Sequence, residues 1–316
     1  MQTRRCLQAV CIRSFTVLCL LLAAFCNLHR FLLTNDGNLL LTSTSIAKEV
    51  SSGNDDASTL SLEEQIRRGT AMALKIARNE FPLNNLTSSL VSVAEWQVDL
   101  QHILNYHHQH DTPCLVYSFG VGSYDAYTEF MAKYCHVFAF EPSIDAKTPY
   151  TNYPNVTFVP YGLGTSKSWS HPTYGRVPAS KLLSLPDIMH RLGHDDGLSV
   201  IAAIKFDCEG CEVSAFQDIQ HVSKTPILSF HTEFHFATTL GMESMDAVAG
   251  LAVVDQVLRE RRCRVDSYRP NRGFRRDRHV YPYLVEKGVP DGVCCYEYTF
   301  SCEHHLEVPR MVPWGY

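Results

Sequence analysis

Short apolar runs alternate with longer amphipathic stretches from residue 112 of this 316-residue chain onward. Apolar runs of about four to eight residues are typical of strands buried on both faces, whereas apolar residues three or four apart are typical of helices. The pattern predicts strands at residues 115–118, 137–140, 156–160, 200–206, 226–230, 264–268 and 295–300, and helices at residues 124–134, 181–192, 213–219 and 245–262. This order predicts an α/β fold with a doubly wound, mainly parallel sheet.

Two further helices are predicted before this alternation begins. Ser61 and Glu64 have the spacing of a capping box, which favours a helix over residues 61–79. Apolar residues at helical spacing favour a second helix over residues 89–107. We therefore expect an added N-terminal helical segment, residues 61–111, beside a main domain formed by residues 112–316.

The first 33 residues have the character of a targeting segment. Arg4, Arg5 and Arg13 precede a nearly uncharged apolar run at residues 14–28. A basic segment followed by an apolar one is typical of secretory targeting. We expect an uncleaved signal anchor, with a cleaved signal peptide as the alternative, and a flexible stem at residues 34–60. Either form predicts a location in the secretory pathway, as a single-pass type II protein of the Golgi membrane or as a secreted protein.

The charge and the cysteine content limit which binding partners and which cellular compartment are expected. The net charge of −5 offers no basic surface for nucleic acid, and the anchor is the only membrane contact that we expect. Of twelve cysteines, four belong to the first 33 residues, and the remaining eight are compatible with disulfides of open connectivity. Glycosylation sequons at Asn85 and Asn155 agree with a lumenal glycoprotein.

A glycine turn and a carboxylate have the spacing of a nucleoside site. Residues 119–123, with the sequence Phe-Gly-Val-Gly-Ser, directly follow the first predicted strand, and Glu141 ends the second strand about twenty residues later. Glycine lets the backbone approach a ligand closely, and a carboxylate can accept both ribose hydroxyl hydrogens. Two glycines instead of three disfavour a dinucleotide and favour S-adenosylmethionine, although an ordinary strand-to-helix turn remains an alternative.

A second strand end is unusually acidic. Residues 204–212 read Ile-Lys-Phe-Asp-Cys-Glu-Gly-Cys-Glu, and ligands of open α/β sheets bind at the carboxyl ends of strands. We expect Asp207 to face the cofactor's amino group or its sulfonium, and Glu209 and Glu212 to face substrate hydroxyls. The alternative is a solvated turn that opens a helix. Cys208 and Cys211 are expected to form a local disulfide or two packed thiols instead of a redox centre.

This segment resembles the I-K-x-D-x-E-G-x-E signature of FkbM-type methyltransferases. Residues 137–142, 155–164, 185–188 and 232–235 are similar to further segments of that family in the same order, and the first strand with Ser118 at its end resembles related secreted methyltransferase-like proteins. The resemblance implies a Rossmann-like class I methyltransferase fold that uses S-adenosyl-L-methionine as cofactor. The predicted cofactor-binding residues are Phe119, Gly120, Gly122, Ser123, Glu141, Gly162 and Asp207.

One departure from that family concerns the cofactor's methionine amine. Ser118 stands where many such enzymes have an acid before the glycines, which leaves the amine without one expected partner.

Residues 231–235, with the sequence His-Thr-Glu-Phe-His, place three polar side chains on one face of a strand. Methyl transfer to a hydroxyl requires a base, so the predicted catalytic residues are Glu209, His231, Glu233 and His235. Two alternatives remain open: a divalent metal held by this face with Asp207 or Glu209, and a hydrogen-bonded structural pair of histidines. No metal ligand is assigned.

These features predict a secretory-pathway methyltransferase that O-methylates a hydroxyl of a glycan or another small-molecule acceptor. One alternative is a Golgi glycosyltransferase in which Asp207 and Glu209 bind a metal and a nucleotide sugar. The other is a non-catalytic lumenal binding module on a methyltransferase scaffold, because a fold does not establish an activity.

Overall fold

The computed structural model describes residues 60–83, 90–144, 150, 152–164, 169–171, 175–222, 225–237, 242, 244–271 and 280–303, all within the second of two compact units, Asp55–Tyr316. The predicted anchor, the predicted stem and the sequon at Asn85 lie outside the described residues. Within these residues, no helix has the length and apolar character needed to cross a membrane.

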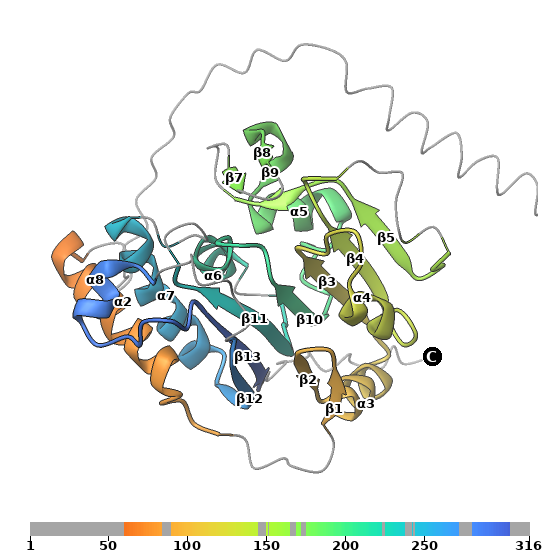
Figure 1. The fold of residues 1–316 in the computed structure, drawn as a ribbon. Coiled ribbons are helices and arrows are strands. Elements are labelled where there is room, and N and C mark those ends of the chain that lie inside the picture. The colour runs from red at the N-terminus through yellow and green to blue at the C-terminus, as the bar shows by residue number, and fades with distance from the viewer. Residues whose placement is uncertain are drawn as a thin grey trace, which may run out of the picture. The chain divides into compact units, whose positions relative to one another are not determined.

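A seven-stranded sheet forms the centre of the fold (Figure 1). Its order is β12-β13-β11-β10-β3-β4-β5. All neighbouring strands from β11 to β5 pair in parallel, whereas β13 is antiparallel to both β11 and β12. The strands are β3 (Leu115–Phe119), β4 (His136–Phe140), β5 (Val156–Val159), β10 (Ile201–Phe206), β11 (Ser229–His235), β12 (Cys263–Asn271) and β13 (Cys295–Cys302). The predicted doubly wound, mainly parallel sheet of a class I methyltransferase fold is therefore confirmed.

Helices cover one face of this sheet as a continuous layer. Its members are α2 (Leu62–Arg78), α5 (Leu185–Leu192), α6 (Glu212–His221), α7 (Met245–Glu260) and α8 (Pro282–Glu286). Their apolar side chains share one core with aromatic residues of the strands, such as Phe206, Phe230 and Tyr298. Helix α2 begins at Ser61, whose hydroxyl accepts a hydrogen bond from the Glu64 N–H, as the capping box predicts.

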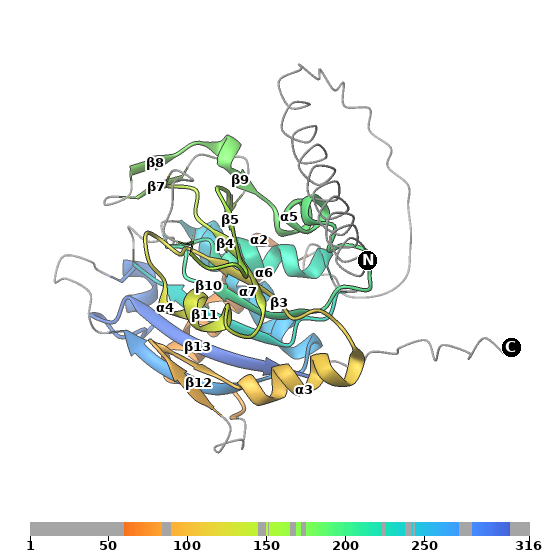
Figure 2. The same ribbon diagram turned by 90° about the vertical axis from the view of Figure 1, so that its right-hand side faces the viewer.

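The opposite face carries a smaller layer (Figure 2). It consists of the hairpin strands β1 (Val91–Val93) and β2 (Trp96–Val98), followed by α3 (Leu100–His110) and α4 (Ala126–Met131). Trp96 and Val98 are fully buried there against Val116 and Val137 of the sheet. The two helical layers explain why the central strands are apolar on both faces.

The predicted helix over residues 89–107 was wrong in its first half. Val93, Trp96 and Val98 are buried while the positions between them are more exposed, which is the period of a strand. A two-residue turn joins β1 to β2, with Ala94 in the left-handed region at φ 52°. The helix begins only after Asp99, whose side chain accepts a hydrogen bond from the His102 N–H at 3.0 Å.

Shorter elements follow β5. Strands β6 (Gly162–Leu163) and β9 (Leu182–Leu183) pair in parallel, and β7 (Trp169–His171) and β8 (Gly175–Val177) form a hairpin. The predicted helix over residues 181–192 is therefore restricted to α5, which begins after the capping residue Ser184. The eight described cysteines form four disulfides, Cys114–Cys135, Cys208–Cys211, Cys263–Cys302 and Cys294–Cys295.

Candidate functional site

A cavity of about 600 Å³ opens where the strand order reverses, between the carboxyl ends of β3 and β10. From β3 the chain continues outward to β4 and β5, and from β10 it continues to β11 on the other side. Such a switch point leaves the loops of neighbouring strands diverging, and ligands of open α/β sheets bind there. The two segments singled out in the sequence, the glycine turn and the acidic strand end, both line this cavity.

Gly120 allows the two strand ends to approach each other. Its φ is +75°, and an added Cβ would lie 1.7 Å from the carbonyl oxygen of Asp207. Gly122 also has a positive φ, +52°, but among the described residues nothing lies within 4 Å of its Cβ position. Gly120 is therefore required for packing, whereas Gly122 keeps backbone exposed to the cavity.

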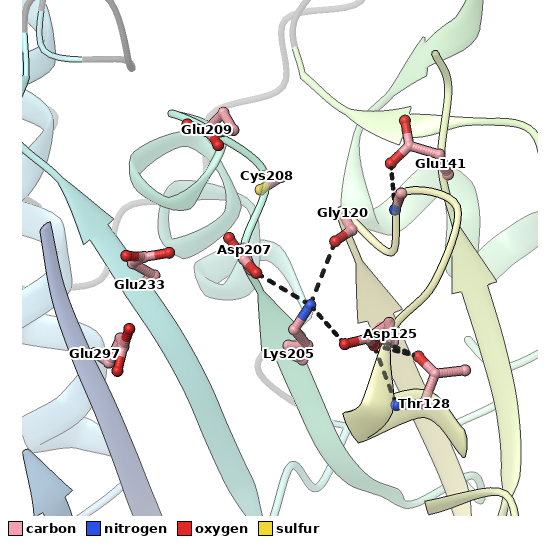
Figure 3. Close-up of polar contacts among 12 residues, drawn as sticks. Gly120, Asp125, Thr128, Glu141, Lys205, Asp207, Cys208, Glu209, Glu233 and Glu297 are labelled. Atoms are coloured by element: carbon pink, nitrogen blue, oxygen red, sulfur yellow. Dashed lines mark hydrogen bonds and ion pairs between the residues drawn. The ribbon is translucent and has the colours of Figure 1, made fainter. Parts of the chain in front are cut away.

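Glu141 closes the glycine turn from the end of β4. Its Oε2 accepts a hydrogen bond from the backbone N–H of Gly122 at 2.9 Å (Figure 3), and its Oε1 accepts one from the backbone N–H of Ser143 at 2.9 Å. The residue is 8% exposed and lines the cavity. Oε1 also accepts a hydrogen bond from the Ser143 hydroxyl at 2.5 Å. Oε2 accepts only one of these bonds and retains a lone pair, so it can accept a hydrogen bond from a ligand's hydroxyl group.

The other predicted cofactor residues differ in their access to the cavity. Gly162 lines it, and a Cβ there would lie 2.7 Å from Cγ of Pro142, so the residue allows this wall to pack closely. Phe119 also lines the cavity but is only 1% exposed and stacks on Phe140. Ser123 is exposed and is not among the residues that line the cavity.

A buried ion pair forms the floor between the two strand ends. Lys205 is 1% exposed, and its Nζ lies 3.5 Å from Oδ1 of Asp125 and 3.3 Å from Oδ2 of Asp207, and donates a 3.3 Å hydrogen bond to the Gly120 carbonyl (Figure 3). Burial alone would lower the pKa of Lys205, but Asp125 and Asp207 outweigh burial and raise it. The side chain is therefore a fixed cation at the cavity wall.

Asp125 is a cavity residue to which the sequence prediction gave no role. It caps α4 by accepting a 3.1 Å hydrogen bond from the Thr128 N–H, and its Oδ2 also accepts one from the Ser118 hydroxyl at 3.1 Å. An acid seven residues further along the chain thus lies beside Ser118, where an acid was expected. An acid at a helix N-cap position is the sequence signal that could have identified it.

Five side chains gather beside the cavity and are called here the acid-histidine cluster: Asp207, Glu209, Glu212, Glu233 and His235. They come from the loop after β10, from the first turn of α6 and from β11. Asp207 and Glu209 line the cavity, and Figure 3 shows Glu233 on the side of Asp207 away from Glu141.

Glu212 does not face substrate, contrary to the sequence prediction. It is 2% exposed, and its Oε1 lies 2.8 Å from Nδ1 of His235 in a hydrogen-bonded ion pair. The same oxygen accepts a hydrogen bond from the Gly210 N–H at 3.3 Å. Glu212 therefore fixes the orientation of His235 from inside the protein.

Burial and close charges shift the titration of the cluster. Burial lowers the pKa of His235, but the carboxylates of Glu212 and Glu233 outweigh burial and hold the pKa well above its usual value. Burial raises the pKa of Asp207 well above its usual value, with Lys205 opposing and Glu233 adding to the rise. Burial alone would also raise the pKa of Glu233, yet His235 and Asn271 lower it to about 2. His235 is therefore held as a cation instead of a base.

His231 lies apart from the other predicted catalytic residues. Its ring contacts Trp96 and Tyr127 on the other side of the sheet from α6, and its nitrogens lie within hydrogen-bonding distance of the Ser229 and Thr299 hydroxyls. Burial, with a smaller contribution from Lys205, lowers the pKa of His231 to about 3. The structure therefore brings Glu209, Glu233 and His235 together and leaves His231 in the core, two residues before Glu233 and four before His235 along β11.

Comparison with known proteins agrees with this geometry. A family model described as a methyltransferase domain matches residues 89–246, which is half of the chain and includes both cavity segments. No curated protein matches the chain.

Several solved structures with partial similarity are methyltransferases. One is the Burkholderia thailandensis 1,6-didemethyltoxoflavin-N1-methyltransferase with bound S-adenosylhomocysteine, at 9% identity and TM-score 0.28, covering 81% of this chain and 94% of that one. Another is the human methyltransferase 10 domain containing protein, at 10% identity and TM-score 0.29, covering 76% and 99%. TM-scores this low do not establish a shared fold, so the assignment rests on the family match and on the strand order.

Proposed function

Because the chain belongs to the family of S-adenosylmethionine-dependent methyltransferase domains, we propose that it transfers the methyl group to a hydroxyl oxygen of a glycan or another lumenal acceptor. The observation that carries this proposal is that the glycine turn, Glu141 and the acidic strand end line one and the same cavity. The narrower resemblance to FkbM-type enzymes, many of which methylate hydroxyls, supports oxygen as the accepting atom.

The donor fits the β3–β4 side of the cavity. Glu141 is fixed by two backbone N–H groups and is available to ribose hydroxyls, and Gly122 keeps the backbone open to the ligand. Asp125, beside Ser118, supplies a carboxylate for the methionine amine, and the buried Lys205 holds Asp125 and Asp207 in the cavity wall. The donor itself supplies an electrophilic methyl group, and the residues bind and orient it.

The acceptor fits the β10 side and the opening of the cavity. Ala94 and Glu95 from the hairpin, and Tyr124, which is 65% exposed, line this opening. Asp207 and Glu209 both line the cavity and retain solvent access, with 25% and 18% of their side chains exposed, but Asp207 already pairs with Lys205, which leaves Glu209 as the candidate. We assign it the contact with the acceptor hydroxyl, whose proton must leave as the methyl group arrives.

The alternatives have lost their main support. The family match favours methyl transfer over a glycosyltransferase in which Asp207 and Glu209 bind a metal for a nucleotide sugar. Asp125 supplies the acid whose absence at Ser118 favoured a non-catalytic module.

The test of the proposed function is donor binding followed by turnover. We expect the purified full-length chain to bind S-adenosylmethionine in calorimetry and to release S-adenosylhomocysteine with at least one member of a panel of hydroxylated glycans. We expect Glu141→Ala to lose about 1.5 to 3 kcal/mol of donor binding, because a buried charged hydrogen-bond acceptor is removed. A chain that neither binds the donor nor turns over with any acceptor would contradict the proposal.

A lumenal location is part of the same proposal. It is supported by the basic and apolar pattern of residues 1–33 and by the four disulfides, which are typical of oxidising compartments. Asn155 is exposed and has a sequon. We expect the protein from secretory cells to shift in mass on glycosidase treatment, and the shift to shrink in Asn155→Gln. A protein recovered without glycan and exposed to cytosolic protease would contradict this location.

A further inference from the structure

The carboxylate of Glu212 orients the His235 ring so that its other nitrogen faces the carboxylates of Glu209 and Glu233. The His235 side chain is fully buried, and its Nδ1 is held by Glu212 at 2.8 Å. Among the described residues, its Nε2 has no partner that satisfies hydrogen-bond geometry. That atom lies 3.4 Å from Oε2 of Glu233 and 3.6 Å from Oε2 of Glu209. A buried ring nitrogen is thus aimed between two carboxylate oxygens, at distances longer than a good hydrogen bond.

These separations are those of atoms that share a metal ion. Imidazole nitrogen and carboxylate oxygen bind a first-row divalent cation at about 2.0 to 2.2 Å. At tetrahedral or octahedral angles, neighbouring ligand atoms are then about 3.0 to 3.6 Å apart. The two measured distances, 3.4 and 3.6 Å, lie in this range. Among the described residues, Glu233 and His235 belong to a group of ligand atoms that all lie within 4.8 Å of one another, and Glu209 does not. The Glu209 carboxylate, which lies in a loop, must therefore turn toward Glu233 to share the ion.

Both buried ligand side chains have outer partners that fix them. Glu212 holds His235 from behind, which is the carboxylate-histidine arrangement found behind many metal-bound imidazoles. Asn271 donates a 2.8 Å hydrogen bond to Oε1 of Glu233 and leaves Oε2 directed at His235. The positions of the ligand atoms are therefore set in advance by groups that would not touch the ion.

The charge balance favours a cation here. Four carboxyl groups, those of Asp207, Glu209, Glu212 and Glu233, share two cationic side chains, His235 and Lys205, and Lys205 also pairs with Asp125. A divalent ion bound to the neutral His235 imidazole would take the place of the imidazolium proton and add two positive charges where that proton added one, which balances the carboxylates more fully.

The nature of the ligands narrows the choice of metal. The sulfur of Cys295 also lies within 4.8 Å of the Glu233 and His235 ligand atoms, but it is bonded to Cys294 and offers no thiolate. One imidazole with two or three carboxylate oxygens suits Mn²⁺ or Zn²⁺ better than a soft copper ion.

We propose that Glu209, Glu233 and His235 bind one divalent cation of the Mn²⁺ or Zn²⁺ class at the cavity wall, with Asp207 as an adjacent oxygen donor. Because Glu209 lines the cavity, an ion bound to it is accessible from the cavity, and an acceptor hydroxyl there completes its coordination. A metal-bound hydroxyl ionises far more readily than a free one, because bound Zn²⁺ lowers the pKa of water from about 15.7 to about 7. This role for the ion rests on the proposed hydroxyl acceptor, whereas the binding of the ion does not.

The test is a Mn²⁺ titration of the full-length chain without donor or acceptor, after treatment with a chelator. We expect one Mn²⁺ per chain, measured by calorimetry and by loss of the free-ion electron paramagnetic resonance signal, with Zn²⁺ competing. Glu209→Gln is expected to weaken binding at least tenfold, and His235→Gln to abolish it.

Glu297→Gln is the matched control. Glu297 lies directly opposite Glu233 in the β11–β13 register and is 3% exposed, but it pairs with Arg269 and not with the cluster. We expect its Mn²⁺ affinity to stay within about twofold of the wild type, a range small against the tenfold loss expected in Glu209→Gln.

Because Glu209 is part-exposed in a loop, its variant is expected to unfold at the wild-type temperature, which separates loss of the site from loss of the fold. Saturable binding that is unchanged in Glu209→Gln, or no binding of either ion to the wild type, would overturn the proposed site. Metal binding with no methyl transfer would leave the site in place and contradict only the proposed function.

Discussion

The carboxylates on the two sides of the cavity have different hydrogen-bond partners: backbone N–H groups on one side and a buried histidine on the other. On the β3–β4 side, Glu141 is fixed by backbone N–H groups of Gly122 and Ser143, all within 22 residues of Gly122 along the chain. On the β10–β11 side, the carboxylates surround a buried histidine, and Glu212 and His235 are 23 residues apart on different elements. The first side is built to accept hydrogen bonds from an uncharged nucleoside, and the second concentrates charge.

This difference indicates separate tasks for the two sides. Backbone-fixed acceptors recognise hydroxyl groups with little electrostatic strain, because the backbone dipoles already stabilise the carboxylate. Carboxylates packed around one cation are stable only while their charges are balanced. We therefore expect donor recognition to depend on the β3–β4 side and acceptor activation to depend on the acid-histidine cluster.

The largest expected effect is at Lys205, which lies between the two sides. Lys205→Met keeps the length of the side chain but removes the cation between Asp125 and Asp207. Breaking a buried ion pair in this way costs about 3 to 5 kcal/mol. We expect a loss of this size in the free energy of unfolding, measured by urea denaturation. A variant as stable as the wild type would show that the two carboxylates are not held as charges by this lysine.

Gly120→Ala is expected to be nearly as damaging. The new Cβ would lie 1.7 Å from the Asp207 carbonyl oxygen, in a residue whose φ is +75°. Left-handed strain of about 1 to 2 kcal/mol and overpacking of about 1 to 3 kcal/mol together predict a loss of about 2 to 5 kcal/mol.

Gly193→Ala is the matched control for this substitution. Its φ is +73°, but nothing among the described residues lies within 4 Å of its Cβ position. We expect it to lose only the strain of about 1 to 2 kcal/mol, measured in the same urea series. Equal losses in the two variants would contradict a close approach of the two strand ends at Gly120.

The smallest effect is expected at His231. It is fully buried and bonded to Ser229 and Thr299, away from the cavity residues. His231→Gln is expected to cost about 0.5 to 1.5 kcal/mol of unfolding free energy, because hydrogen bonds are changed without a charge being lost. Donor affinity and Mn²⁺ affinity are expected to stay at wild-type values in titrations. A tenfold change in either affinity would show that His231 does contribute to the site.

Sequence reasoning succeeded where the determinants are local. The central strands, the glycine turn and Glu141 follow from apolar runs, from glycine positions and from a spacing of about twenty residues. The hairpin at residues 91–98 was missed because its two strands have only three residues each, too few for an alternating pattern to stand out, and because Trp96 and Val98 are buried by a tertiary contact with the sheet.

Long-range contacts account for the other differences. Asp125 and Lys205 meet only because β3 and β10 are neighbours in the sheet, and Glu212 turns inward only because His235 lies opposite the first turn of α6. His231 and His235 share one face of β11, but at about 3.3 Å of rise per residue they end in different surroundings. A strand period identifies the face of a side chain and not the depth at which it lies.

The division of the cavity is tested most directly by titrating S-adenosylmethionine into the wild type, Glu141→Ala and Glu209→Gln under the same conditions. The account predicts that Glu141→Ala loses about 1.5 to 3 kcal/mol of donor binding. Glu209→Gln is predicted to bind the donor as tightly as the wild type. Unchanged affinity in Glu141→Ala, or an equal loss in both variants, would contradict the assignment of donor recognition to the β3–β4 side.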